Sequence, residues 1–279
     1  MPLAPSLRLP IAALLLAGLA CKPTNQPDSK PPGEVADVDD DKLPERPPIE
    51  RSGELMATGQ HAEALAVLDE ALRTTPDDPE LLYARGIALE QLGKPQDAVA
   101  AWQAAVARKP DFFPALNGIG AVQLDAGQAA EAVASFKAAI AAKPDFADAH
   151  YNLGRAHLVL GDAAAARTAL EAANRLAPED VDVLLVLTEL HRKAGRSDDA
   201  LLTARAAAKL APDDAEVRRT LGHVLMEKDL HAEAQAEFTA ALLKKPGDVD
   251  AQLGLARALV KQGKAEEALV PLADLAVRV

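Results

Sequence analysis

A period of 34 residues runs through most of this chain and restricts its fold more than any other feature. Prolines recur with that step at Pro76, Pro110, Pro144, Pro178, Pro212 and Pro246. Alanines keep the same step at Ala64, Ala98, Ala132, Ala166, Ala200, Ala234 and Ala268. A fixed step over roughly 200 residues is typical of stacked repeats, in which each unit packs only on its neighbours. We therefore expect one elongated repeat array in place of separate globular domains.

Each unit has the pattern of two amphipathic helices. In residues 147–180, small and apolar residues recur at three- and four-residue steps on both sides of Gly161. Glycine permits the left-handed backbone that often ends a helix. Pro178 cannot continue the second helix, so it marks the turn into the next unit. Acidic residues that follow the prolines, such as Asp145, lie where a helix N-terminus favours negative charge.

The unit resembles the tetratricopeptide repeat (TPR), whose 34-residue signature has glycine at place 8, alanine at places 20 and 27, a bulky apolar residue at place 24 and proline at place 32. Place 8 is filled by Gly86, Gly120, Gly154 and Gly222. Place 24 is filled by Leu68, Trp102, Phe136, Leu170, Phe238 and Leu272. The resemblance implies an all-α fold, a right-handed α-solenoid of about seven stacked TPR helix pairs, which we place in residues 48–279.

Four units depart from the signature. The first helix of the first unit is expected to begin late, near Ile49, because two prolines precede it. The fifth unit has Thr188 and Ala204 at the places of the glycine and the bulky residue, which predicts a lightly packed middle. In the sixth unit Asp229 replaces the helix-ending glycine. Pro271 falls inside the last helix, so we expect the last repeat to be frayed, paired with a second copy or docked on a partner.

In the TPR family the first helices line a concave groove that binds extended peptides or partner helices. The resemblance therefore implies a protein partner, and the register places these residues in the groove: Tyr83, Asn117, Tyr151, Asn152, Arg155, Leu158, Arg192, Arg219 and His223. The arginines predict that the C-terminal half of the groove receives an acidic or carboxylate-bearing segment, with Tyr151 and Leu158 in apolar contact. The alternative is that these are ordinary solvated charges close to Asp182, Glu189 and Glu227.

The composition and motifs argue against several other functions. A formal net charge of −12 disfavours nucleic acid as a partner, because binding to it needs a basic face. No HExxH, GxSxG or phosphate-binding glycine loop is present, so we expect no enzyme activity and no cofactor. His150 and His157 are spaced like metal ligands, but the register assigns five of the six histidines to packing. We expect no metal site.

The N-terminal segment resembles an export signal followed by a linker. Residues 1–20 resemble a signal peptide, with a short apolar run that is too short to span a membrane. Cys21 follows Gly18-Leu19-Ala20, which resembles the lipobox of bacterial lipoproteins and implies lipidation at Cys21. Gly18 departs from the usual leucine, so ordinary cleavage after Ala20 stays open. Residues 21–47 are rich in proline and acids and are expected to be a disordered linker.

These features predict a protein-interaction scaffold that is lipid-anchored in the bacterial cell envelope, in the outer membrane in preference to the inner one. Its partner belongs to an envelope, pilus or export assembly on this reading, and the last repeat offers a surface for self-association. The alternative is a soluble periplasmic or secreted adaptor subunit of an enzyme complex, without its own anchor.

Overall fold

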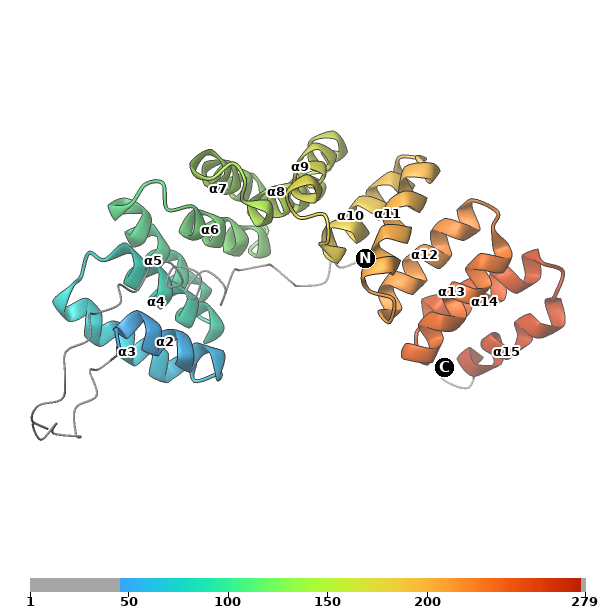
Figure 1. The fold of residues 1–279 in the computed structure, drawn as a ribbon, viewed down its shortest axis with the longest axis horizontal. Helices are drawn as coiled ribbons and strands as arrows, with labels where there is room; N and C mark the ends of the chain where they lie inside the picture. The colour runs from blue at the N-terminus through green and yellow to red at the C-terminus, as the bar shows by residue number, and fades with distance from the viewer. Residues whose placement is uncertain (1–45, 277–279) are drawn as a thin grey trace, which may run out of the picture. The chain divides into compact units, whose positions relative to one another are not determined.

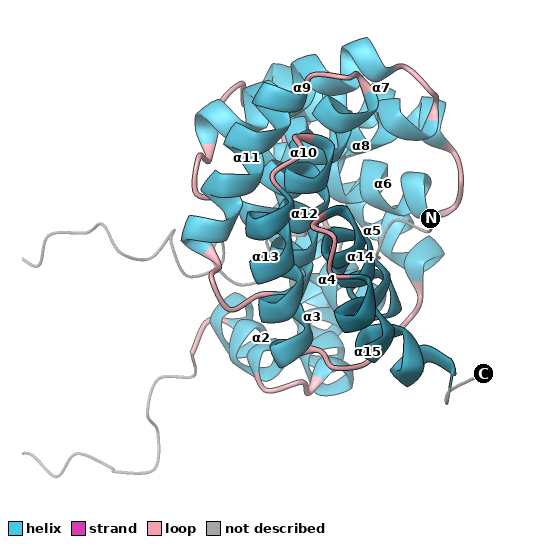
Figure 2. Cartoon of the chain, turned by 90° about the vertical axis from the view of Figure 1, so that its right-hand side faces the viewer, coloured by secondary structure: helices cyan, strands magenta, loops and turns pink. Residues whose placement is uncertain are grey.

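The computed structural model describes residues 46–276. The predicted signal peptide, Cys21 and nearly all of the predicted linker lie outside the described residues. The chain divides into two compact units at Pro144, and each is treated by itself below. Within the described residues the regular structure is entirely helical, as Figure 2 shows.

The N-terminal unit, residues 46–144, contains three helix pairs (Figure 1). They are α2 (Pro48–Ala57) with α3 (His61–Thr74), α4 (Pro79–Gln91) with α5 (Pro95–Arg108), and α6 (Phe113–Asp125) with α7 (Ala129–Ala142). The first helix begins at Pro48, one residue before the predicted start at Ile49. Proline is tolerated there because the first helical position has no intrahelical partner for an N–H group.

The C-terminal unit, residues 145–276, contains four pairs. They are α8 (Ala147–Val159) with α9 (Ala163–Leu176), α10 (Val181–Lys193) with α11 (Ser197–Leu210), α12 (Ala215–Glu227) with α13 (His231–Lys244), and α14 (Val249–Lys261) with α15 (Ala265–Ala276). In both units the even-numbered helix is the first of its pair. The first helices α10, α12 and α14 also contact one another in sequence, so they form a continuous face.

The helix ends follow from the residues that the period places there. Gly161 has a φ of 78°, the left-handed region that glycine adopts without strain, and it joins α8 to α9. Asp229 holds the same place between α12 and α13 with a φ of 57°, the one non-glycine residue with a positive φ in the described part of the chain. Side chains of aspartates after the repeated prolines accept hydrogen bonds from backbone N–H groups of the next helix, at Asp78, Asp180, Asp214 and Asp248.

The core is built from small residues around one large side chain per repeat. Trp102, Phe136 and Phe238 are fully buried, and glycines on the neighbouring first helices leave room for their rings. The indole Nε1 of Trp102 donates to the carbonyl oxygen of Tyr83 at 3.1 Å, which satisfies its polar group. Close helix approach therefore depends on glycine facing the ring.

The fifth and last repeats contain residues that depart from the repeat signature. Thr188 and Ala204 are buried, and the Thr188 hydroxyl lies 2.8 Å from both the Leu184 carbonyl oxygen and the Thr203 hydroxyl. A hydroxyl pair thus occupies the region where other repeats have glycine facing a ring. In the last repeat, α15 continues through Pro271 as far as Ala276.

Candidate functional site

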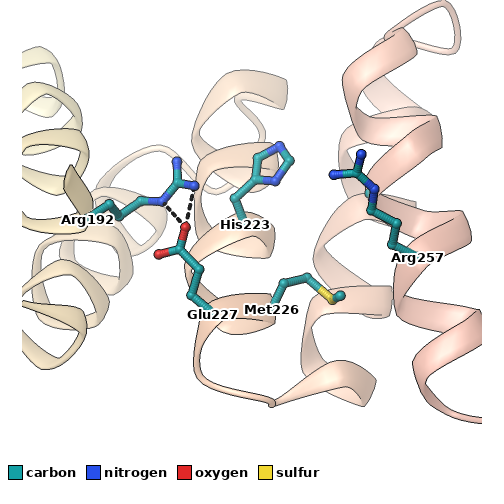
Figure 3. Close-up of a pocket in the computed structure, with 6 residues that line it drawn as sticks. Arg192, His223, Met226, Glu227 and Arg257 are labelled. Carbon is teal, nitrogen blue, oxygen red and sulfur yellow. Dashed lines mark hydrogen bonds and ion pairs between the residues drawn. The ribbon is translucent and has the colours of Figure 1, made fainter. Parts of the chain in front are cut away.

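A pocket of about 240 Å³ opens on the first helices of the C-terminal unit. Three consecutive repeats contribute to it, because its lining comes from α10, α12 and α14: Arg192, His223, Met226, Glu227, Gly254 and Arg257. Figure 3 shows Arg192 and Arg257 on opposite sides of the α12 residues His223 and Met226. The pocket is therefore a product of repeat stacking and belongs to no single repeat.

One wall of the pocket is a network of one arginine and two carboxylates. Arg192 donates to Glu227 Oε1 from Nε at 2.9 Å and from Nη2 at 2.5 Å, and to Glu189 Oε2 from Nη1 at 2.8 Å. Burial alone would lower the pKa of Arg192, but the hydrogen bonds and charges of Glu227 and Glu189 outweigh it and raise that pKa. The charge of Arg192 is thus already balanced within the chain.

A second network, which includes the pocket residue His223, joins α12 to the start of α14. Arg219 Nη1 lies 3.1 Å from Asp248 Oδ2, and the Asp248 side chain is 4% exposed. His223 Nε2 lies 3.2 Å from Asp250 Oδ2, and its ring meets the ring of Phe238 edge-on at 5.0 Å. Burial lowers the pKa of His223, although the charge of Asp250 acts in the opposite direction.

The opposite wall of the pocket carries a cation, Arg257, whose charge is not balanced by a nearby carboxylate of the described residues. Arg257 on α14 is exposed and makes no ion pair or hydrogen bond with the described residues. Met226 lies between the two walls and presents an adaptable apolar side chain to the pocket. The site therefore combines an unpaired guanidinium, a thioether and an ion pair, which suits a partner side chain with both apolar and anionic character.

The residues that the register placed in a groove have different environments in the structure. Tyr83 and Asn117, in the N-terminal unit, are buried, as are Tyr151, Asn152 and Arg155 in the C-terminal unit, whereas Leu158, Arg192, Arg219 and His223 are partly exposed. The pocket brings together only Arg192 and His223 of this set. Arg192 pairs with Glu189 and Glu227, and Arg219 pairs with Asp248.

Sequence reasoning did not single out Gly254, and it named Glu227 only as a charge close to the arginines of the groove. Gly254 holds place 6 of the seventh repeat, where neighbouring repeats have Asn152, Val186 and Thr220. A Cβ added at Gly254 would lie 2.5 Å from the ring of Phe238, so the ring requires glycine there. The sequence feature that could have identified Gly254 is a glycine at a place where the repeat signature does not have one.

Two other kinds of site have little support in residues 46–276. No three His, Cys, Asp or Glu side chains in this range are grouped so that they could hold a metal ion. Among the described helices, none combines the length and the apolar character that crossing a membrane requires.

Sequence-family profiles identify the repeat. The profile of the cilia and flagella-associated protein 70 C-terminal domain matches residues 80–276, and a TPR-repeat profile matches residues 54–93. The chain belongs to the TPR family. The predicted all-α solenoid of TPR helix pairs is thus confirmed, with seven pairs in the described residues. No curated protein matches the sequence of this TPR protein.

Solved structures share the TPR fold over most of their own length. PilF of Pseudomonas aeruginosa aligns with a TM-score of 0.69 over 75% of this chain and 96% of its own, at 19% identity. YrrB, described as a TPR protein with an unusual peptide-binding site, aligns with a TM-score of 0.56 over 66% and 95%, at 21% identity. MamA from Desulfovibrio magneticus RS-1 is 32% identical, with a TM-score of 0.50 over 59% and 92%. The TPR architecture is that of a protein-interaction scaffold.

Proposed function

We propose that this TPR protein holds an extended segment of a partner protein on the first helices of its C-terminal unit, with the segment anchored in the pocket between Arg192 and Arg257. The observation that carries the proposal is the pocket itself, which three successive first helices form together. Ligand sites are typically concave, with a few polar groups that fix orientation. An extended segment can cross several helices in a row, so it can contact residues of three successive repeats.

The chemistry of the lining suggests what the segment contributes. Met226 offers apolar contact in the middle of the pocket, while Arg257 supplies a positive charge that the described residues leave unpaired. An acidic side chain of the partner would pair with Arg257 and need not displace Glu227 from Arg192. The peptide-binding site named for YrrB supports a peptide ligand, because the two proteins share the TPR fold.

A capture experiment tests the proposal. We would crosslink cells that express the protein, purify it and identify the bound proteins for the wild type and for the variants Arg257→Ala and Met226→Ala. Arg175→Ala is the matched control, because Arg175 on α9 is also exposed and has no ion pair with the described residues. We expect one or more partners to be reduced about tenfold with either pocket variant and unchanged with the control. Equal capture by all four proteins would contradict the pocket as the binding site.

We further propose that lipidation of Cys21 tethers this scaffold to the cell envelope, at the outer membrane, where the partner belongs to an envelope, pilus or export assembly. The support is the lipobox-like sequence before Cys21 and the linker of residues 21–47. Mass spectrometry of the mature N-terminus tests this directly. A diacylated or triacylated Cys21 supports the tether, whereas an unmodified thiol favours a soluble periplasmic or secreted adaptor.

A further inference from the structure

The outward side of α14 carries aliphatic and cationic side chains and no carboxylate. Its residues recur at steps of three and four, so they share one side of the helix. They are Val249, Leu253, Arg257, Val260 and Lys261, and all five are exposed. Arg257 and Lys261 make no ion pair with any residue in the described range. These five residues form the α14 face.

Two carboxylates close to the α14 face already have partners. Asp250 is the only acidic residue of α14, and its carboxylate lies 3.8 Å from Arg219 Nε. Glu227 lines the same pocket as Arg257 but pairs with Arg192 on the other side, as Figure 3 shows. The cations of the α14 face are thus left without a counter-charge by the described residues, and aliphatic side chains flank them. A segment that combines carboxylates with small aliphatic residues would complement this face.

The chain itself contains a segment of this kind, before the first described residue. Residues 34–41 read Glu-Val-Ala-Asp-Val-Asp-Asp-Asp, with five carboxylates, three small aliphatic side chains and no cation. At about 3.3 Å per residue, eight extended residues span about 26 Å. The thirteen residues of α14 rise about 20 Å at 1.5 Å per residue. The segment is therefore long enough to lie along the whole α14 face.

We infer that residues 34–41 of one copy bind to the α14 face of a second copy. Aspartates of the segment pair with Arg257 and Lys261, and its two valines lie against the aliphatic residues of the face. A second copy is the source because Asp41 precedes the N-terminal unit by only five residues, at most about 18 Å of chain, whereas α14 belongs to the last repeat of the C-terminal unit. The inference goes beyond the proposed function, since it gives Arg257 a second ligand.

The inferred contact is head-to-tail, because the two surfaces that meet are different. Such contacts can continue from copy to copy and join several molecules in a row. A pairing of two last repeats would instead use the same surface of both copies and would stop at a dimer. Variants that remove one surface at a time can therefore distinguish the two arrangements.

Analytical ultracentrifugation measures the contact. All proteins start at residue 21 and carry Cys21→Ser, so that neither acylation nor a disulfide joins the copies. The face variant carries Arg257→Ala and Lys261→Ala. The segment variant carries four substitutions that remove carboxylates: Asp37→Asn, Asp39→Asn, Asp40→Asn and Asp41→Asn. We expect the dissociation constant of self-association to rise about tenfold in either variant at low salt. Added salt should weaken the wild-type contact, because its charges lie at the surface.

A mixture of the two variants is the most specific measurement. The segment variant keeps an intact α14 face, and the face variant keeps an intact acidic segment. In equal amounts they should form a heterodimer with the wild-type dissociation constant and no larger species, because one contact remains. The matched control is Arg175→Ala with Lys209→Ala, which removes two charges from exposed positions on α9 and α11 and should self-associate like the wild type.

Any of three results would overturn the inference. The wild type stays monomeric up to about 0.5 mM at low salt; the control variant weakens self-association as much as the face variant does; or the mixture stays monomeric. The proposed function has a separate test, because its capture experiment also uses Met226→Ala, which lies outside the α14 face. Reduced capture by Met226→Ala together with a monomeric mixture would support the proposed function and overturn only this inference.

Discussion

The ring of Phe238 fills the space that a side chain at Gly222 would need: a Cβ added at Gly222 would lie 2.7 Å from ring atom Cε1. The same ring blocks Gly254 of the following repeat at 2.5 Å and meets His223 edge-on. One phenyl ring thus sets the distance between α12, α13 and α14 and supports two residues that line the pocket. A change in the packing around Phe238 should therefore also move residues of the candidate binding site.

Replacing Gly222 with alanine should destabilise the protein by roughly 1–3 kcal/mol, because the added methyl group overpacks the core against Phe238. The control is Gly53→Ala in α2, where an added Cβ meets nothing within 4 Å. That substitution should stabilise the protein by about 0.5–1 kcal/mol through helix propensity. Urea denaturation followed by circular dichroism measures both, and equal effects would contradict the packing argument.

Gly161 and Asp229 occupy the same place between the two helices of their repeats. Replacing each with the other residue should lower stability at Gly161 and raise it at Asp229. Gly161→Asp should destabilise the protein by about 1 kcal/mol, since its φ of 78° suits glycine and strains other residues. Asp229→Gly should relieve a smaller strain at its φ of 57°. Differential scanning calorimetry of both variants is the measurement, and a lower Tm for Asp229→Gly would show that the aspartate contributes more than its backbone strain.

Asp248 has two roles that conservative variants can separate. Its Oδ1 accepts from the backbone N–H groups of Asp250 and Ala251 at 3.1 Å, and its Oδ2 pairs with Arg219. Asp248→Ala removes the helix cap and the charge, and we expect a loss of roughly 2–4 kcal/mol. Asp248→Asn keeps a capping oxygen, so it should lose clearly less. Chemical denaturation at low ionic strength compares them, and equal losses would mean that the cap contributes little.

Glu90 should make the stability of the N-terminal unit depend on pH. Burial, and secondarily the charge of Asp125, raises the pKa of Glu90 from 4.5 to about 7. The folded state therefore holds this proton more tightly than the unfolded state does. The resulting stabilisation is complete below pH 4.5 and is lost as the pH rises through 7.

The variant Glu90→Gln has no such proton to lose. It should match the wild type near pH 4.5 and unfold at a higher temperature than the wild type at pH 8. The difference in Tm between the two proteins across this pH range isolates Glu90 from the other carboxyl groups. A difference that stays constant with pH would contradict the raised pKa.

The 34-residue period was sufficient to predict the helix pairs, because glycine, proline and the small residues act locally on the backbone. It also predicted the late start of α2 and identified Asp229 as the exception among the helix-ending residues. These features depend on conformational preferences within a few residues, which a linear pattern can express.

Ion pairing and burial on the first helices could not be read from the same pattern. Arg192 and Glu227 are 35 residues apart in the sequence, yet their charges are joined across two repeats. The register placed Arg192 on a first helix, but only the packing of α10 against α12 shows that its charge is balanced by Glu227.

By itself, the sequence determined the all-α repeat, its length and the places where each helix begins and ends, because those depend on local backbone preferences repeated at a constant step. Only the tertiary structure decided which charges are satisfied and where a pocket forms. Both depend on side-chain distances between helices that lie a full repeat apart, and these distances are set by the large side chains that glycine leaves room for.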